Sequence, residues 1–343
     1  AEFITDLTHP NGAGNPDRAL RAANQHYADV AMSIQRTTEE AILRMVRQLH
    51  RTTGSENLCI AGGVALNSMA NGRIAREGPF KNVFIQPAAG DSGGALGAAL
   101  YAWHVLLGKP RTFVMEHAYW GAASTPAQIA HFLREKGLPY REVDPDKLLD
   151  ELVDDMTSGR VSGWFQGRFE WGPRALGNRS ILADPRSEAM KEIVNEKIKF
   201  REPFRPFAPA VLEERAADYY DTPRLDENLM ARYMLLVSPV REERWDEVPA
   251  TTHMGSGRLQ TVRREWNPRY YDLIQRFGQA TGTPVILNTS FNLRGEPIVT
   301  TPQNAFNTFV GSDIDVLVLE NFVVRKEDMG NRWQPAFKGA LGE

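Results

Sequence analysis

Apolar residues recur every three or four positions along the first fifty residues, a pattern typical of an amphipathic helix. The pattern predicts a helix over residues 16–53 that ends at Gly54, with a bend expected near Thr37 and Thr38. The apolar positions of this helix are Tyr27, Val30, Ala31, Ile34, Ile42, Met45, Val46 and Leu49.

Two similar units follow, each made of an apolar strand, a glycine-rich turn and a helix. The first is NLCIAGGVALNSMANGRIA, which turns at Gly62 and Gly63. The second is NVFIQPAAGDSGGALGAALYAWHVLL, with a strand at residues 83–85, a glycine loop around Asp91 and a helix to about residue 107. Strand, glycine loop and helix in series predict α/β architecture with parallel strands.

The segment GKPRTF, residues 108–113, is short, polar and proline-bearing, as expected at a domain boundary. Beyond it, helices are predicted over residues 125–137, 146–159, 187–200 and 267–281, and one more begins at Thr301 and Pro302. Strands are predicted at residues 160–169, 233–240, 258–262, 283–290, 297–300 and 315–325. The second part of the chain is therefore expected to be an α+β domain.

Composition narrows the function classes. The 343 residues are enough for two domains, and the formal net charge of −3 argues against a general nucleic-acid coating protein. The single cysteine, Cys59, is expected to be buried and inert, and it suits a cytoplasmic location. No run of about 18 apolar residues occurs, so we expect no membrane span, and no signal peptide is evident.

Basic residues gather in glycine- and proline-rich turns of the second part. From residue 160 to residue 205 the chain has ten Lys or Arg against six Asp or Glu. Arginines in such turns favour a phosphate or carboxylate site over a solvated face, which would place them on helices beside acidic partners. The candidate anion-binding residues are Arg174, Lys199, Arg205, Arg258 and Arg294. Structural pairing with Glu170, Asp184 or Glu202 is the alternative role for Arg179, Arg186 and Arg201.

The two glycine loops have two open interpretations. Backbone N–H groups at a helix N-terminus can seat a nucleotide, with Asn67 bonding a ribose or phosphate. Small residues are also what tight packing between a strand and a helix requires. Asp91 is either an N-cap or a metal ligand. The seven histidines are scattered, so a complete metal site within this chain is not expected.

Several long motifs taken together resemble the O-carbamoyltransferases of antibiotic and nodulation-factor biosynthesis. They run in order from about residue 15 to residue 326 and include AGGVALNSMANGRI, PAAGDSGGALGAAL, GWFQGRFEWGPRALGNRSILADPRS, KFREPFRPFAPAVL and PVILNTSFNLRGEPIV. The resemblance implies the C-terminal part of an actin/hexokinase-like (ASKHA) domain over residues 1–110. A YrdC-like α+β domain over residues 111–330 and a tail over residues 331–343 would follow.

The resemblance also implies a chemistry. Carbamoyl phosphate and ATP would give carbamoyl-adenylate, whose carbamoyl group passes to a hydroxyl of a small-molecule acceptor, with a divalent metal nearby (iron, and magnesium with ATP). By similarity, the five basic residues above contact phosphate or the carbamoyl oxygen. The residues implied to seat the adenylate are Gly62, Gly63, Asn67, Gly90, Ser290 and Asn292, with Asp91 as a metal ligand.

One departure from the family pattern concerns the metal. The family's N-terminal lobe carries a His-x-x-x-His pair, which this sequence lacks. We therefore expect a missing N-terminal lobe of the same enzyme to be a partner of this chain. Alternatives are a non-catalytic nucleotide- or RNA-binding module, with nucleic acid disfavoured by the net charge, or a related threonylcarbamoylation or hydrogenase-maturation carbamoyltransferase.

Overall fold

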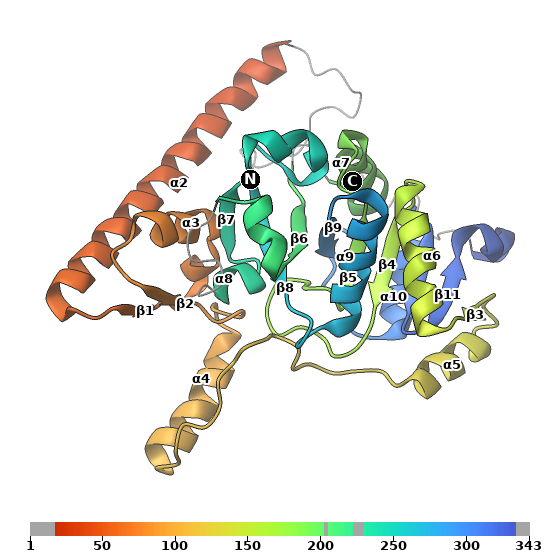
Figure 1. The fold of residues 1–343 in the computed structure, drawn as a ribbon, viewed down its shortest axis with the longest axis horizontal. Coiled ribbons are helices and arrows are strands. Elements are labelled where there is room, and N and C mark those ends of the chain that lie inside the picture. The colour runs from red at the N-terminus through yellow and green to blue at the C-terminus, as the bar shows by residue number, and fades with distance from the viewer. Residues whose placement is uncertain (1–17, 202–204, 222–228, 334–343) are drawn as a thin grey trace.

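A nine-stranded mixed sheet forms the centre of the molecule, and a smaller unit with two strands lies beside its β7 edge (Figure 1). The computed structural model describes residues 18–201, 205–221 and 229–333. The boundary predicted at residue 110 falls between the strands of the two sheets along the chain, and it stays a prediction.

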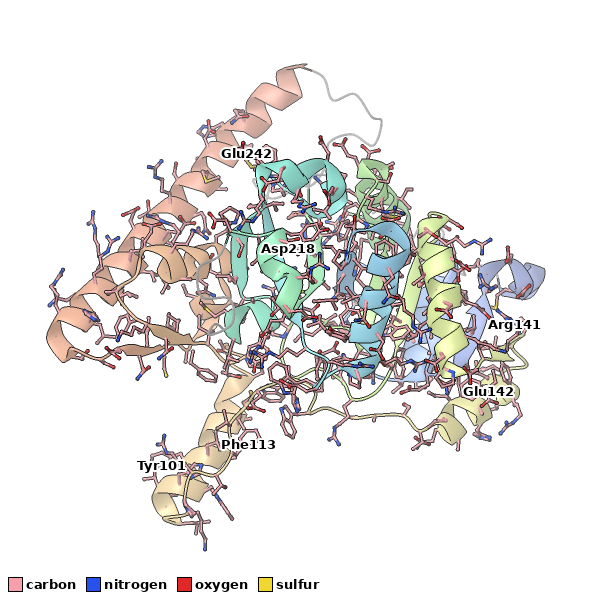
Figure 2. The ribbon with its side chains drawn as sticks, viewed as in Figure 1. Tyr101, Phe113, Arg141, Glu142, Asp218 and Glu242 are labelled. Carbon is pink, nitrogen blue, oxygen red and sulfur yellow. The ribbon has the colours of Figure 1, made fainter. Side chains whose placement is uncertain are left out.

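The smaller unit contains the two predicted strand–loop–helix units. Its elements are α2 (Arg18–Thr53), β1 (Asn57–Cys59), a 3-10 helix (Gly63–Leu66), α3 (Ser68–Glu77), β2 (Asn82–Phe84), α4 (Gly93–Tyr101) and a π-helical turn (Ala102–Leu106). Strands β1 and β2 pair in parallel, as the sequence predicted. Helix α4 projects from the body, and Figure 2 shows Tyr101 at its end, with Phe113 on the returning chain.

The long first helix is confirmed, but two details differ from the expectation. Helix α2 runs through Thr37 and Thr38 without interruption. It buries Leu43 and Val46 in a small core, whereas Met45 is 71% exposed, so the predicted apolar stripe is only partly covered. Burial of Cys59 was also wrongly predicted. Its side chain is exposed because it alternates along β1 with the buried Leu58.

The large sheet has the order β3-β11-β10-β4-β5-β9-β6-β8-β7, with parallel pairs β10–β4 and β6–β8. Its strands are β3 (Arg141–Glu142), β4 (Ser162–Phe165), β5 (Arg179–Ala183), β6 (Ala208–Leu212), β7 (Leu236–Pro239), β8 (Ser256–Val262), β9 (Val285–Ser290), β10 (Val316–Leu319) and β11 (Phe322–Arg325). The mixed α/β character is confirmed. The strand predicted at residues 297–300 is absent from this described segment, which is irregular.

Helices cover both faces of this sheet. Helices α6 (Pro145–Thr157) and α9 (Pro268–Thr281) pack side by side over one face, seen in front of the sheet in Figure 1. On the other face lie α5 (Pro126–Glu135), α7 (Glu188–Ile193) and α10 (Pro302–Val310), while α8 (Leu229–Arg232) packs near β8. Thr125 and Thr301, at which two of the predicted helices begin, are N-caps, and each forms a capping box. No helix within the described ranges is both long and apolar enough to span a membrane.

The smaller unit docks on the sheet through α3. Gly72 lies so close to β7 that a Cβ atom there would sit 2.3 Å from the carbonyl oxygen of Val237. The Asn71 side chain donates to the carbonyl of Leu235 at 2.9 Å, and Arg76 donates to that of Val237 at 3.1 Å. Glycine at position 72 is therefore what allows the helix to reach the strand edge.

Candidate functional site

Polar side chains from two strands of the large sheet point to one face, in the first part of β8 and the last part of β9. In the register, Gln260 lies opposite Ala210 of β6, and Asn288 lies opposite Ala208. Because side chains alternate along a strand, Arg258 and Gln260 of β8 share this face with Asn288 and Ser290 of β9. Arginine, glutamine and asparagine in the middle of a sheet are unusual, since strand interiors favour apolar residues. They mark this part of the sheet as a candidate site.

The loop between β4 and β5 lies over this face and carries Arg174. A single carboxylate oxygen of Glu170 accepts the backbone N–H groups of Leu176, Asn178 and Arg179 at 2.7, 2.8 and 3.2 Å. Glu170 is buried, and this burial raises the pKa of its carboxyl group, although the N–H groups of Leu176 and Asn178 and the charge of Arg179 oppose the shift. The loop that presents Arg174 is therefore fixed from inside.

Glycine allows the same loop to pack closely on α9. Gly177 has φ of 103° and lies against the Tyr270 ring, so an added Cβ would come within 2.2 Å of the ring. The loop is also tied to the sheet: Asn288 donates to the carbonyl of Ala175 at 3.2 Å, and Gln260 donates to that of Leu176 at 2.8 Å. Glycine at position 177, the second glycine of GPRALGNRS, is thus required both by the backbone conformation and by the lack of space for a side chain.

A cavity of about 340 Å³ opens between this loop and the sheet. Its lining residues are Pro173, Arg174, Ala175, Arg201, Arg205, Pro206, Met234, Arg258, Asn288, Thr289 and Ser290. Four of them are arginines, and among the described residues no Asp or Glu lines the cavity. The structure therefore brings together three of the five predicted anion-binding residues, Arg174, Arg205 and Arg258.

Two of the cavity arginines, Arg174 and Arg258, are poorly compensated. The Nε atoms of Arg174 and Arg258 are buried, and neither has a hydrogen-bond partner among the described residues. The pKa of Arg258 is lowered to about 9, chiefly by burial and further by the charges of Arg174 and Arg201, and burial also lowers the pKa of Arg174. Burying guanidinium groups beside one another costs free energy that an anion in the cavity would offset.

Lys199 lies beside the cavity and is not among the described residues that line it. Its ammonium group donates to the carbonyl of Ser290, to that of Asn292 at 2.9 Å and to Asn292 Oδ1 at 2.8 Å. Burial holds the pKa of Lys199 well below its ordinary value, and Arg201 adds to the effect. Lys199, Ser290 and Asn292 thus form one cluster, in which the lysine fixes the loop after β9.

Arg201 and Arg294 differ in their relation to the cavity. Arg201 lines the cavity, donates to Asn195 at 2.7 Å and lies over the Phe207 ring at 4.8 Å. Its position two residues after Lys199, in the basic KFREPFRPF stretch, was the signal that was available. Glu202, one of the acidic partners suggested for it, lies outside the described residues, so structural pairing of Arg201 stays a prediction. Arg294 is exposed and is not among the described residues that line the cavity.

Arg179 is the structural arginine that the sequence suggested, but its partners are carbonyl groups. It is fully buried, and its guanidinium lies 3.6 Å from the centre of the Phe165 ring. Its terminal nitrogens donate to the carbonyls of Gln166, Gly167, Asn178 and Ala122 at 2.5 to 3.5 Å. Arg179 therefore ties the two ends of the loop together from behind the cavity.

The glycine loops after β1 and β2 lie side by side. The Gly62 N–H group donates to the carbonyl of Ala89 at 2.8 Å, and a Cβ on Gly90 would lie 3.8 Å from the Cα of Gly63. Gly62 has φ of 104°, a conformation that favours glycine. The loops therefore converge as two neighbouring phosphate loops would, and their contact with an adenylate stays a prediction.

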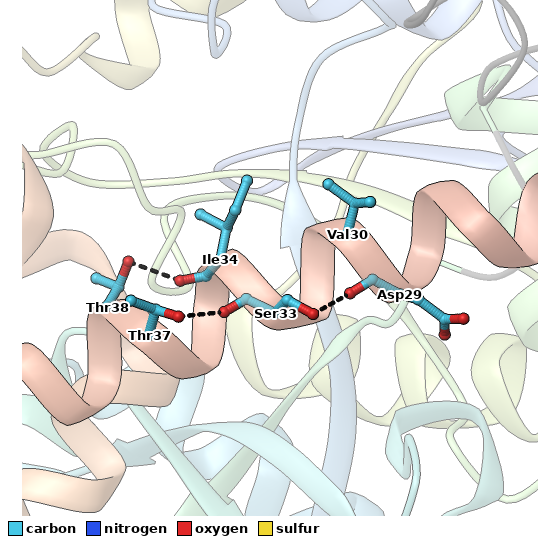
Figure 3. A pocket seen from close by; sticks show the side chains of 6 residues that line it. All are labelled: Asp29, Val30, Ser33, Ile34, Thr37 and Thr38. Atoms are coloured by element: carbon cyan, nitrogen blue, oxygen red, sulfur yellow. Dashed lines mark hydrogen bonds between the residues drawn. The ribbon is translucent and has the colours of Figure 1, made fainter.

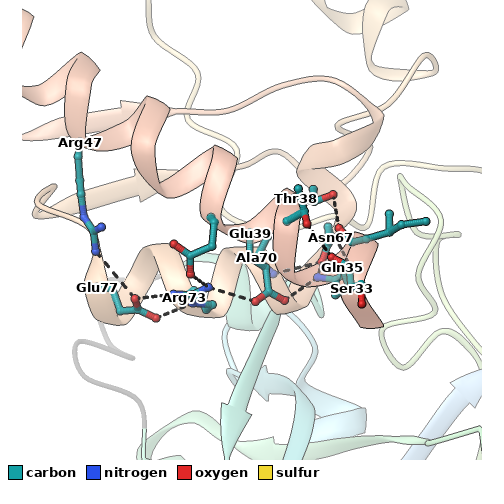
Figure 4. Close-up of polar contacts among 12 residues, drawn as sticks. Ser33, Gln35, Thr38, Glu39, Arg47, Asn67, Ala70, Arg73 and Glu77 are labelled. Carbon is teal, nitrogen blue, oxygen red and sulfur yellow. Dashed lines mark hydrogen bonds and ion pairs between the residues drawn. The ribbon is translucent and has the colours of Figure 1, made fainter. Parts of the chain in front are cut away.

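The Asn67 amide has two partners inside this unit, seen in Figure 4. Its Oδ1 caps α3 by accepting from Ala70 at 3.1 Å, and it exchanges hydrogen bonds of 3.0 and 3.1 Å with Gln35. Nearby, Arg73 forms ion pairs with Glu39, Glu40 and Glu77. The polar groups of this region are thus largely matched to one another.

Asp91 does not serve as the N-cap of α4, one of its two expected roles, because the cap residue is Ser92. Within the described part of the chain, no three His, Cys, Asp or Glu side chains lie close enough together to hold a metal ion. A metal site built from these residues alone is therefore not supported.

Another hollow, of about 400 Å³, runs along α2 (Figure 3). Its lining residues are Asp29, Val30, Ser33, Ile34, Thr37 and Thr38, all on one helix. The three hydroxyl groups donate to carbonyls of the preceding turn, so no set of free polar groups converges there. The arginine cavity is the stronger candidate.

Comparison with known proteins identifies two family models in this chain: the carbamoyltransferase N-terminus over residues 13–100 and the carbamoyltransferase C-terminus over residues 153–326. An uncharacterized protein of Synechocystis is 44% identical over 98% of this chain, and the nodulation protein NolO of Bradyrhizobium diazoefficiens is 42% identical over 88%. The 3'-hydroxymethylcephem-O-carbamoyltransferase of Streptomyces clavuligerus is 37% identical over 71%.

The alignments cover 60%, 55% and 43% of those three relatives, so the chain spans about half the length of the curated relatives it matches. Among solved structures, full-length HypF in its phosphate- and nucleotide-bound form matches 54% of this chain and 21% of HypF. Its TM-score of 0.32 and identity of 13% are too low to carry an argument. The family models and the sequence relatives suffice: the chain belongs to the carbamoyltransferase family.

Proposed function

We propose that this chain holds the carbamoyl phosphate- and ATP-binding part of an O-carbamoyltransferase. The observation that carries the proposal is the 340 Å³ cavity, lined by four arginines and by none of the described acidic residues. Membership of the carbamoyltransferase family supports carbamoyl phosphate as the anion. A guanidinium binds phosphate through paired hydrogen bonds, so four of them suit substrates rich in phosphate oxygens.

The residues divide into those that bind and those that position. Arg174, Arg201, Arg205 and Arg258 are proposed to hold phosphate oxygens, because they line the cavity. Lys199 holds Ser290 and Asn292 in place, and these two residues are proposed to contact the nucleotide. Arg294 is proposed to reach the substrates from the exposed loop after β9.

The reaction brings together two polyanions. Water would release carbamate and phosphate from carbamoyl phosphate, and a carbamate oxygen would then displace pyrophosphate from ATP to give carbamoyl-adenylate. Fixed cations offset the repulsion between the phosphates, and they do so most strongly where water is excluded. The partly buried guanidiniums of Arg174 and Arg258, whose pKa burial lowers, suit this requirement.

The remaining parts of the proposal concern the whole enzyme. The glycine loops at Gly62, Gly63 and Gly90 are proposed to receive the adenylate through their backbone, in an actin/hexokinase-like unit beside a YrdC-like one. The acceptor is proposed to be a hydroxyl-bearing natural product, as the name of the Streptomyces relative suggests. Magnesium would accompany ATP. Iron is assigned no step, because the described residues do not form a site for it.

The test is pyrophosphate release by the purified chain supplied with ATP, magnesium and carbamoyl phosphate. We expect release that requires both substrates and that is lost in R258M but kept in R215M. Arg215 is a suitable control because it lies on the surface, half exposed, in an ion pair with Asp218. Absence of both pyrophosphate release and carbamoyl phosphate binding would refute the proposal.

A further inference from the structure

Asn195 is a buried side chain that bonds to two residues of the arginine cavity. It is 0% exposed, lies in a π-helical turn (Val194–Lys199) that continues α7, and is not among the described residues that line the cavity. Its Oδ1 accepts from the Nε of Arg201 at 2.7 Å, and its Nδ2 donates to the carbonyl of Arg205 at 3.0 Å. One buried amide therefore links two of the four cavity arginines.

These two hydrogen bonds fix which end of the Asn195 amide faces which arginine. A carbonyl oxygen only accepts hydrogen bonds, so the amide nitrogen must face the carbonyl of Arg205. The amide oxygen then faces the guanidinium of Arg201, which only donates. A reversed amide would lose both bonds, so the two contacts assign the same orientation.

The backbone around Asn195 is built to bring Arg201 back against it. A π-helical turn closes each hydrogen bond one residue later than an α-helix does, and such turns are frequent at functional sites. The Asn195 carbonyl accepts the N–H of Phe200 and, at 3.1 Å, that of Arg201. Phe200 has φ of 47°, in the left-handed region that few bulky residues adopt, and such strain clusters at functional sites. The chain turns there, and the Arg201 side chain returns to a residue six positions earlier.

The guanidinium of Arg201 has a second support on its face. It lies 4.8 Å from the centre of the Phe207 ring, while Asn195 holds its Nε. These two contacts together fix the plane of the guanidinium. Phosphate recognition depends on that plane, because the paired hydrogen bonds of an arginine run parallel within it. A displacement of about 1 Å in a group that holds a substrate can lower a rate by about a hundredfold.

We propose that Asn195 is a positioning residue, which orients the Arg201 guanidinium toward phosphate oxygens and does not itself contact substrate. The inference rests on the proposed function, since it takes pyrophosphate release in the arginine cavity as the reaction that Arg201 serves. Lys199, at the end of the same turn, holds Ser290 and Asn292. The turn after α7 thus carries two buried polar side chains that each fix a different part of the site.

The experiment is a double-mutant cycle on pyrophosphate release from radiolabelled ATP, with magnesium and carbamoyl phosphate present. N195A is expected to lower kcat/KM for carbamoyl phosphate by about a hundredfold, because Arg201 loses its orientation. In R201M the same substitution should lower it further by less than about threefold, because the residue through which Asn195 acts is already gone. Equal losses in the two backgrounds would overturn the proposal, since Asn195 would then act independently of Arg201.

N71A is the matched control for a loss of folding stability. Asn71 is also buried, and its amide donates to the carbonyls of Ala65 and Leu235 at 2.8 and 2.9 Å. None of these three is among the described residues that line the cavity. N71A should lower Tm, while kcat/KM measured well below Tm stays at the wild-type value. A loss of kcat/KM in N71A as large as that in N195A would overturn the proposal.

The remaining outcomes separate this inference from the proposed function. N195S replaces N195A if that variant does not fold, because a serine hydroxyl lies too close to the backbone to form both bonds. An R201M variant with wild-type activity would overturn the inference and leave the proposed function to the other three arginines. If the wild type releases no pyrophosphate, the proposed function fails, and this inference fails with it.

Discussion

The glycine loops and the arginine cavity were both predicted from the sequence as anion sites, and the structure shows how differently they are built. In the smaller unit, the Asn67 amide is bonded to Ala70 and Gln35, and the charges around Arg73 are paired. In the cavity, Arg174 and Arg258 are partly buried, and their buried Nε atoms have no partner among the described residues. The polar side chains around Asn67 and Arg73 are therefore bonded to one another, whereas the Nε atoms of Arg174 and Arg258 are not bonded to any described residue.

The same difference separates two arginines within the large sheet. Arg179 is buried and Arg258 partly buried, but Arg179 donates to four backbone carbonyls, whereas Arg258 has two other arginines among its neighbours. A buried charge with good partners maintains the fold, and one without them suits a ligand. The partners of a side chain, more than its type or its burial, therefore indicate its role.

Arg258→Met gives the largest expected effect. It removes a partly buried guanidinium from the cavity, so carbamoyl phosphate should bind about a thousandfold more weakly, a loss of about 4 kcal/mol of binding free energy. The free energy of unfolding should stay the same or rise, because an apolar side chain of similar length replaces an uncompensated charge. Calorimetry measures the first quantity and urea denaturation the second.

Binding within about threefold of wild type would place Arg258 outside the site. A large loss of stability with normal binding of the folded fraction would show that its role is structural, as proposed for Arg179. R215M supplies the baseline for both measurements, since exposed ion pairs contribute less than about 1 kcal/mol.

Arg179→Met should show the opposite behaviour. Four backbone carbonyls would lose a charged donor, so we expect the free energy of unfolding to fall by about 3 kcal/mol. The folded fraction should bind carbamoyl phosphate with nearly wild-type affinity if the loop keeps its shape, because Glu170 still holds the backbone of the Arg174 loop. If R179M were as stable as the wild type, Arg179 would not have the structural role that distinguishes it from Arg258.

Local patterns predicted most of the elements. The strand–loop–helix units, the parallel pairing of β1 with β2 and the caps at Thr125 and Thr301 all follow from residues adjacent in sequence. Burial along α2 was predicted less well: periodicity placed Met45 on the buried face, but the structure exposes Met45 and buries Leu43. Periodicity places residues on a face of a helix, but only the tertiary fold decides which part of that face is covered.

The site was only partly predicted, because the tertiary fold also decides which distant residues meet there. Position in a glycine- or proline-rich turn indicated Arg174, Arg205 and Arg258, but the structure places Arg258 on strand β8. The Lys199 contact with Ser290 depends on residues ninety-one positions apart. Asn288 was overlooked although it interrupts the apolar strand VILNTS, where asparagine is disfavoured. Its position directly after three apolar strand residues was a signal in the sequence that could have identified it.

Asn67 provides the smallest expected effect and tests the other half of the comparison. Asn67→Ala removes the cap of α3 and should lower the free energy of unfolding by about 1 kcal/mol in urea denaturation. Asn67→Asp keeps an acceptor for the Ala70 N–H and places a negative charge at a helix N-terminus, so its stability should stay near that of wild type. Because the amide is already bonded to Ala70 and Gln35, ATP affinity should be unchanged in both variants. A marked loss of ATP affinity in N67D without a loss of stability would instead show that Asn67 contacts the nucleotide, and the glycine loops would then be a binding site of the same standing as the arginine cavity.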